Sequence, residues 1–452
     1  MTGATVAIRL ASRLGASLAP LFALLDAVVP PGLVEVGISH DRSSPARPRL
    51  TLALLSTAHA AIHAQSALLP LVYAVVIVEY GLDGSDIGTF IAITTAVGGT
   101  MQLAYGFLTR YIARPTLLAG GQIVFGAGLL IGGLSQSIGQ LLGAISIARI
   151  GSSPQHPVGN ALLSDLYPPE RRGFAISAHI SGGNVGTVLV PFIGGALIIA
   201  IGWQATLALF GIPALVIGVL IAILVREDHA EYRRAAKASG SVREHVREVL
   251  GRRDLRLILA ASLVAAGGRG LDIVAPFMVL YLSGPLGFDS GTVNLLYALL
   301  LVGAVVGPIL AGVLSDRFGR RPTLITYYVL SAVGIVAFVL AGANLFLLVP
   351  LLLPFGTAVF SESPVLQAYL ADRADGPMRD VAFAVYFTFA FGIGAVWAFI
   401  IGNVVEGFGY PAAFGVMAAS YLAAAALLVA VRERVAPGPG LGPGPARTDV
   451  SV

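Results

Sequence analysis

The chain has 452 residues, of which 56% are hydrophobic and 12% are charged, and its formal net charge is +4. Soluble globular domains carry about 25% charged residues, so this chain lacks the polar side chains needed to cover a large water-exposed surface. The composition therefore excludes a large soluble protein and predicts a helical protein that crosses a membrane several times. The absence of cysteine excludes disulfides and thiolate chemistry.

The first 48 residues precede the strongly apolar part of the chain. Residues 14–34 are apolar enough to suggest a signal peptide or an additional helix, but Asp26 and two prolines interrupt them. A group of arginines follows just before residue 50 and opposes translocation of this end. We therefore interpret residues 1–48 as an interfacial or loosely ordered extension.

A helix needs about 20 apolar residues to cross the hydrocarbon core of a bilayer. Applied along the chain, this length predicts twelve spans and hence an all-α membrane protein. The predicted spans are 50–79, 88–108, 115–134, 140–163, 174–200, 204–225, 256–282, 291–314, 322–342, 345–370, 382–405 and 411–431. Loops that carry Lys or Arg alternate with loops that carry neither, and the positive-inside rule places the first set in the cytoplasm together with both termini. We expect a multi-pass protein of the cell (inner) membrane.

The predicted spans form two groups of six, in residues 49–226 and 256–432. Between them, residues 227–255 carry charges of both signs at three- and four-residue spacing, which favours a short surface helix in a cytoplasmic linker. A weak repeat relates residues 106–115 to 312–322, after the second span of each group. Residues 433–452, rich in Pro and Gly, are expected to be a disordered cytoplasmic tail.

The loop at residues 312–321 reads Gly-Val-Leu-Ser-Asp-Arg-Phe-Gly-Arg-Arg. It resembles the cytoplasmic loop signature of the major facilitator superfamily, G-x-L-[SA]-D-R-x-G-R-[KR]. The resemblance covers about residues 50–432. It implies two pseudo-symmetric halves of six helices around a central cavity, and a transporter rather than an enzyme.

This loop is predicted to be a conformational latch on the cytoplasmic side. Its residues are Gly312, Asp316, Arg317, Gly319, Arg320 and Arg321. Gly312 would allow a close helix approach, and Gly319 suits a turn with positive φ. Asp316 is placed to face a helix N-terminus or an arginine, and the arginines suit acidic groups or lipid phosphates. Because the repeat at 106–115 has no Asp, we expect a latch in the second half only.

Polar and ionisable residues inside the spans indicate the substrate or proton pathway, since each costs about 2.5–3.5 kcal/mol at the bilayer centre. They fall on the first, fourth, seventh and tenth spans. They are His59, His63, Arg149, His156, Asn160, Arg269, Asp272 and Glu362. In the superfamily those four helices line the central cavity, so the resemblance and the pattern agree.

The chemistry of these residues suggests their roles. A buried Glu362 favours its neutral form and suits proton loading and release. Asp272 is either a second proton site or a structural partner of Arg269, three residues away. Arg149 would hold an anionic cargo or switch partners with a carboxylate. The histidines either move protons and bind cargo or hold helices together. His59 and His63 would suit a metal ion with a third ligand, but none is evident in the sequence, so we expect no metal and no cofactor.

The fifth span contains a run of glycines with one proline. It consists of Gly182, Gly183, Gly186, Pro191, Gly194 and Gly195. The run resembles the antiporter signature of the superfamily, with Val190 replacing a glycine; ordinary small-residue packing is the alternative. Short patches at 59–70, 151–157 and 182–186 also look like the fosmidomycin-resistance branch of drug exporters.

The expected function is secondary active transport of a small organic compound by alternating access. The resemblance favours proton-coupled export, that is, antiport with protons. The alternative is a proton symporter or facilitator that imports an organic acid or another small nutrient. The expected partners are the small-molecule substrate, protons and membrane lipid, with no nucleic acid, and the expected state is a monomer.

Overall fold

The computed structural model describes residues 47–109, 111–227, 242–373, 382–383 and 385–431. The predicted extension up to residue 46, the tail from 433 and part of the linker lie outside these residues. Every regular element in the described part is helical, as the composition predicts. Nine helices there are long and apolar enough to cross a membrane.

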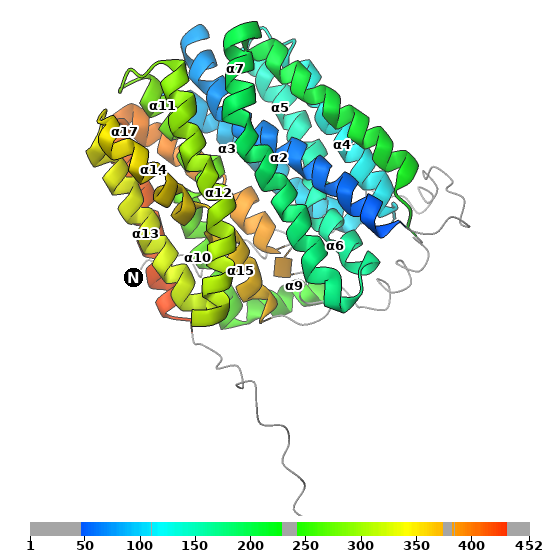
Figure 1. The fold of residues 1–452 in the computed structure, drawn as a ribbon. Helices are drawn as coiled ribbons and strands as arrows, with labels where there is room; N and C mark the ends of the chain where they lie inside the picture. The colour runs from blue at the N-terminus through cyan, green and yellow to red at the C-terminus, as the bar shows by residue number, and fades with distance from the viewer. Residues whose placement is uncertain (1–46, 110, 228–241, 374–381, 384, 432–452) are drawn as a thin grey trace, which may run out of the picture.

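The helices form two groups along the chain, which lie on opposite sides of the molecule (Figure 1). The first group contains α2 (Pro48–Glu79), α3 (Gly84–Leu108), α4 (Arg114–Gly132), α5 (Ile138–Ser152), the 3-10 turn η1 (Ser153–Gln155), α6 (Pro157–Leu166) and α7 (Pro169–Leu224). The second group contains α10 (Arg253–Ala265), the 3-10 turn η2 (Ala266–Gly268), the π-helix η3 (Gly270–Val274), α11 (Ala275–Ser283), α12 (Ser290–Phe318), α13 (Arg320–Ala341), α14 (Leu345–Val359), α15 (Glu362–Ala371), the π-helix η4 (Thr388–Ile393) and α17 (Val396–Val429). Between the groups, α9 (Val242–Gly251) lies in the predicted linker.

Two long helices contain a sharp break at a glycine. Gly202 in α7 has φ 80° and ψ 164°, and Gly409 in α17 has φ 80° and ψ 169°. Only glycine adopts this conformation without a steric cost, so the chain reverses at these two points. The stretch from α5 to α6 is interrupted instead by Pro154 and Pro157, which cannot donate helical hydrogen bonds.

The two groups are held together by close backbone contacts of α3. A Cβ atom on Gly88 would lie 2.8 Å from the Cα atom of Gly402, and one on Gly99 would overlap the backbone at Gly392. Small residues allow membrane helices to approach in this way. A hydrogen bond of 3.0 Å from the Tyr297 hydroxyl to the Ala67 carbonyl also joins the groups.

Two helices begin with an aspartate cap after a short loop. Asp83 caps α3 and Asp289 caps α12 through hydrogen bonds to backbone amides of the first turn. The hydroxyl of Ser85 lowers the pKa of Asp83, and the hydroxyl of Thr292 lowers that of Asp289. Each cap fixes the entry into the helix that follows and satisfies amides that have no helical partner.

The glycine run of α7 is a packing face. An added Cβ atom on Gly182 would meet Ser56, and one on Gly186 would meet the carbonyl of Ala60, both in α2. An added Cβ atom on Gly195 would meet the side chain of Asn294 in α12. The run therefore packs α7 against α2 and, at its far end, against the second group.

We predict that Gly186→Ala destabilises the protein by about 1–3 kcal/mol, because the new methyl group overpacks the α2–α7 contact. Gly143→Ala is the matched control, since no atom lies within 4 Å of its Cβ position. We expect the control to be neutral or slightly stabilising. Thermal unfolding of the purified protein measures both, and equal melting temperatures would contradict the packing role.

Candidate functional site

A buried ion pair links the start of the second group to α15. Arg269 donates from Nε and Nη2 to one oxygen of Glu362, at 3.1 and 3.0 Å. Its Nη1 atom donates to the carbonyl of Ala390, and its guanidinium lies 4.7 Å from the ring centre of Phe391. Both side chains are almost fully buried. The second oxygen of Glu362 has no hydrogen-bond partner among the described residues.

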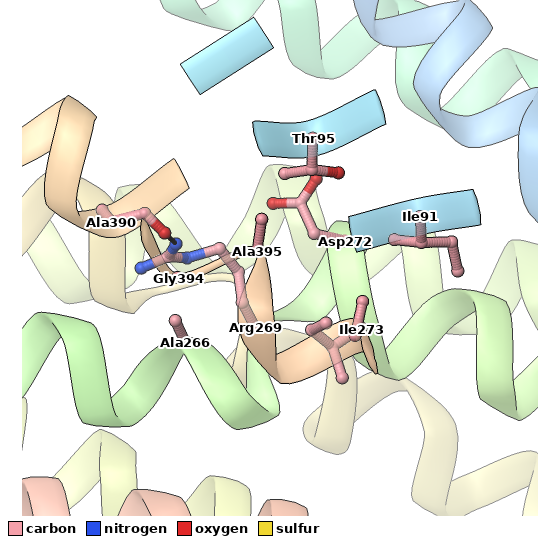
Figure 2. A pocket seen from close by; sticks show the side chains of 10 residues that line it. Ile91, Thr95, Ala266, Arg269, Asp272, Ile273, Ala390, Gly394 and Ala395 are labelled. Atoms are coloured by element: carbon pink, nitrogen blue, oxygen red, sulfur yellow. Dashed lines mark hydrogen bonds between the residues drawn. The ribbon is translucent and has the colours of Figure 1, made fainter. Parts of the chain in front are cut away.

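The partner of Arg269 differs from the one that the sequence spacing suggested. Three residues separate Arg269 from Asp272, which is a pairing distance on a regular helix. The chain is not helical there, because Arg269 has φ −60° and ψ 131° between the 3-10 turn and the π-helix. This break directs Arg269 to Glu362, whereas the carboxylate of Asp272 turns toward Thr95 of α3 (Figure 2).

A small space lies between the two groups, beside Arg269 and Asp272 (Figure 2). Its walls come from α3, η2, η3, η4 and α17. It has about 10 Å³ of free volume, which is room for about one water molecule. The space is therefore too small for an organic substrate in this conformation.

Four histidines gather in the first group. The ring of His59 lies 4.4 Å from that of His63, 4.8 Å from that of His156 and 4.5 Å from that of His179, measured between ring centres. Nitrogen atoms of His59, His63 and His156 all lie within 4.8 Å of one another. His63 and His156 remain partly exposed.

His179 is missing from the residues expected from the sequence. It stacks on His59 with an angle of 22° between the ring planes. It is a single histidine near the start of the fifth predicted span, whereas the sequence pattern directed attention to spans one, four, seven and ten. Its contact with His59 depends on the packing of α7 against α2, so no local sequence signal identifies it.

Two further predicted site residues accompany the histidines. Arg149 donates to the hydroxyl of Ser66 at 3.3 Å, and its Nε atom has no partner among the described residues. Asn160 is partly exposed in α6, and its Oδ1 atom also lacks a partner there. Both residues therefore keep a buried polar atom without a hydrogen-bond partner among the described residues.

The predicted pathway residues therefore form two separate clusters. The histidine cluster belongs to the first group of helices, and the cluster of Arg269, Asp272 and Glu362 belongs to the second. A row of aromatic rings joins them. His156 stacks on Phe387 at 5.5 Å, Phe387 stacks on Phe391 at 6.0 Å, and Phe391 lies beside Arg269.

The predicted latch forms ion pairs at the ends of α12, α13 and α15. Arg320 pairs with Asp316 and, at 3.1 Å, with Asp372. Arg321 donates to two carbonyl groups at the end of α17. Gly319 has φ 91°, which confirms the predicted turn. The prediction for Gly312 was wrong, because an added Cβ atom there would meet no other atom within 4 Å.

The first group has an ion cluster of its own at the corresponding place. Arg114, at the start of α4, pairs with Asp165 at 2.7 Å and with Glu227. The first group therefore also pairs charges here, and the expectation of a latch in the second half only stays a prediction. The acidic partners come from the end of α6 and the chain after α7, so a comparison of the two loops could not reveal them.

The family model described as the Major Facilitator Superfamily matches residues 54–271 and again residues 258–449. The chain belongs to the Major Facilitator Superfamily. Its members are membrane transporters and not enzymes, so this chain is a transporter of small organic compounds.

Among curated relatives, a protein of Cupriavidus necator named a probable sulfoacetate transporter is 25% identical over 60% of this chain and 64% of its own length. The multidrug resistance protein MdtG of Citrobacter koseri is 26% identical over 74% of this chain and 82% of its own. Among solved structures, the nucleoside transporter NupG has a TM-score of 0.71 at 12% identity and covers 86% of this chain and 100% of its own. This last likeness concerns the fold alone.

The latch geometry leads to a prediction about transport rate. Asp316→Asn should change the rate of substrate exchange several-fold and leave substrate affinity nearly unchanged, because Asp316 pairs with Arg320 far from both clusters. Glu406→Gln, which removes an exposed carboxylate of α17 outside the latch, is the control. Exchange assays in proteoliposomes measure the rate, and binding titrations measure the affinity. A large loss of affinity with normal exchange would contradict the latch role.

Proposed function

We propose that this chain is a proton-coupled symporter of a small organic anion, built from twelve transmembrane helices in two halves. The observation that carries the proposal is the buried ion pair of Arg269 and Glu362. An anionic substrate would need the same guanidinium group that the carboxylate of Glu362 now binds. The histidine cluster with Arg149 offers a second cationic and hydrogen-bonding surface.

The helix count follows from the breaks in the long helices. Nine helices of the described part meet the criteria for a span. Dividing α7 at Gly202 and α17 at Gly409 adds two spans to these nine. The broken stretch from α5 to α6 adds one more span, which gives twelve. Six of these lie in each group, and the two family matches support a division into halves. With the positive loops inside, both termini are cytoplasmic.

The coupling follows from competition for Arg269. While Glu362 is ionised, it neutralises Arg269 and repels an incoming anion. A proton on Glu362 removes that negative charge and frees the guanidinium for the substrate. Because linkage is reciprocal, a bound anion equally favours the proton on Glu362. Proton and anion therefore load together and are released together, which is symport.

The change of access follows from the closed interface. Backbone contacts between α3 and α17 leave the space beside Arg269 too small for a substrate in this conformation. Rocking of the halves about this interface opens the site to one side of the membrane at a time. The clusters around Arg114 and Arg320 brace the helix ends of each half during this motion.

A second candidate function is proton-coupled export, which the glycine run of α7 supports. That run packs directly against α2 and against Asn294 of the other group, where the halves move relative to each other. The likeness to a multidrug resistance protein also supports it. In antiport, substrate and proton compete, so acid would weaken substrate binding instead of strengthening it.

Replacing Glu362 tests the coupling. In proteoliposomes, Glu362→Gln should keep downhill exchange of an organic acid such as sulfoacetate but lose proton-driven accumulation, since glutamine is permanently neutral. Glu406→Gln, which removes an exposed carboxylate of α17, is the matched control. Normal proton-driven accumulation of the organic acid by Glu362→Gln would contradict the coupling role of Glu362. Acid-weakened binding in the unmodified protein would favour antiport.

Arg149→Gln tests recognition of the anion. A hydrogen bond to a charged group contributes about 1.5–3 kcal/mol, so the Michaelis constant should rise roughly ten- to hundredfold. Ser66→Ala removes the hydroxyl that accepts a hydrogen bond from Arg149 and should change the Michaelis constant by much less. Uptake measured against substrate concentration gives both values. An unchanged Michaelis constant in Arg149→Gln would remove this arginine from the substrate site.

A further inference from the structure

We propose that His59, His63 and His156 form a binding site for a divalent transition-metal ion with the ligand preference of Zn²⁺. Each of the three offers a ring nitrogen, and these nitrogens lie within 4.8 Å of one another. His59 and His63 are four residues apart on α2, the spacing that presents two imidazoles on one helix face to a metal. His156, between η1 and α6, supplies the third ligand that the sequence did not reveal.

The hydrogen bond of His59 leaves its second nitrogen available. Its Nδ1 atom lies 3.0 Å from the backbone oxygen of His179. A carbonyl oxygen only accepts, so Nδ1 carries the hydrogen, and in the neutral ring Nε2 keeps its lone pair. That Nε2 atom is buried and has no partner among the described residues. A buried nitrogen without a partner requires an explanation, and a metal ion provides one.

The same reasoning applies to His63. Its Nδ1 atom lies 3.2 Å from the hydroxyl of Thr187, and that hydroxyl donates to the carbonyl of Gly183 at 3.3 Å. The hydroxyl therefore accepts from Nδ1, which leaves the lone pair on Nε2. Metal-binding histidines usually have their other nitrogen fixed by such a partner. Gly183 also leaves room for the His59 ring, since an added Cβ atom would lie 3.1 Å from ring atoms.

The site needs only a small contraction to bind an ion. Zn–N distances of about 2.0–2.1 Å in a tetrahedral site place ligand nitrogens about 3.4 Å apart. Nitrogens that now lie within 4.8 Å can reach this spacing by side-chain rotations that move each ring by about an ångström. His63 and His156 are partly exposed, which gives the ion a way in.

The charge around the site points to an additional anionic ligand. Three neutral histidines leave the fourth position of a tetrahedral ion open. Arg149 reaches the helix that carries His59 and His63, because it donates to the hydroxyl of Ser66, three residues after His63. An anion on the open position would offset the charge of the metal ion and pair with Arg149. This part of the inference rests on the proposed function, in which the substrate is an organic anion.

The test is a metal titration of the purified full chain, prepared with a histidine-free affinity tag. Calorimetry with Zn²⁺ should show one site per chain, and Co²⁺ should give the visible absorption of a tetrahedral nitrogen site. His63→Gln and His156→Gln should each weaken binding at least about a hundredfold. Thr187→Val should weaken it about ten- to hundredfold by releasing His63. Glu406→Gln, which removes an exposed carboxylate of α17, should leave it unchanged.

Absence of a saturable one-to-one site for Zn²⁺ and Co²⁺ would overturn the proposal, as would equal affinities in the unmodified protein and both histidine variants. Thermal unfolding verifies that each variant is folded, and His156→Asn replaces any variant that is not. Symport with normal proton coupling but without metal binding would refute the metal site alone. Metal binding without proton coupling would refute the proposed function alone.

Discussion

A charge buried among membrane helices has no water to stabilise it, and that constraint explains the arrangement of the polar residues in this chain. An unpaired ionised group in such a place costs several kcal/mol, so each must find a partner within the protein. Arg269 does so three times, with Glu362, with the carbonyl of Ala390 and with the ring of Phe391. The local helix is interrupted to make this possible, because Arg269 itself has an extended backbone.

The same constraint operates at the helix ends in a different form. Arg114 and Arg320 each begin a helix of their group, and each pairs with an aspartate at the end of another helix. Arg114 is nearly buried, so its pairs with Asp165 and Glu227 are needed to compensate its charge. Such pairs join helices that are distant in sequence, and they break and re-form only when helix ends move. This property suits a protein that alternates between conformations.

The two polar clusters are neighbours through aromatic contacts. His156 of the first group stacks on Phe387, and Phe391 of the same segment stacks on Phe387 and lies beside Arg269. The π-helix η4 carries Phe391 and the carbonyl of Ala390, so one irregular segment contacts both clusters. The two clusters are therefore joined by a short chain of packed rings.

Composition and apolar length determined the helical membrane architecture, because a bilayer accepts little else over spans of this length. The loop at 312–321 determined the family, and the need for φ above zero at Gly319 is evident from that loop alone. The sequence also showed which residues are ionisable and lie within spans, since polarity inside an apolar run is a local property.

The pairings were decided by the tertiary structure. The partner of Arg269 is 93 residues away, and the acidic partners of Arg114 are 51 and 113 residues away, so no local spacing could indicate them. The meeting of His59, His63, His156 and His179 depends on how α7 packs its glycines against α2. The sequence by itself determined which charged and polar groups inside the membrane need a partner. Only the packing of distant helices decided which partner each group has. The reason is that helix contacts are set by the shapes of the helix surfaces and not by position along the chain.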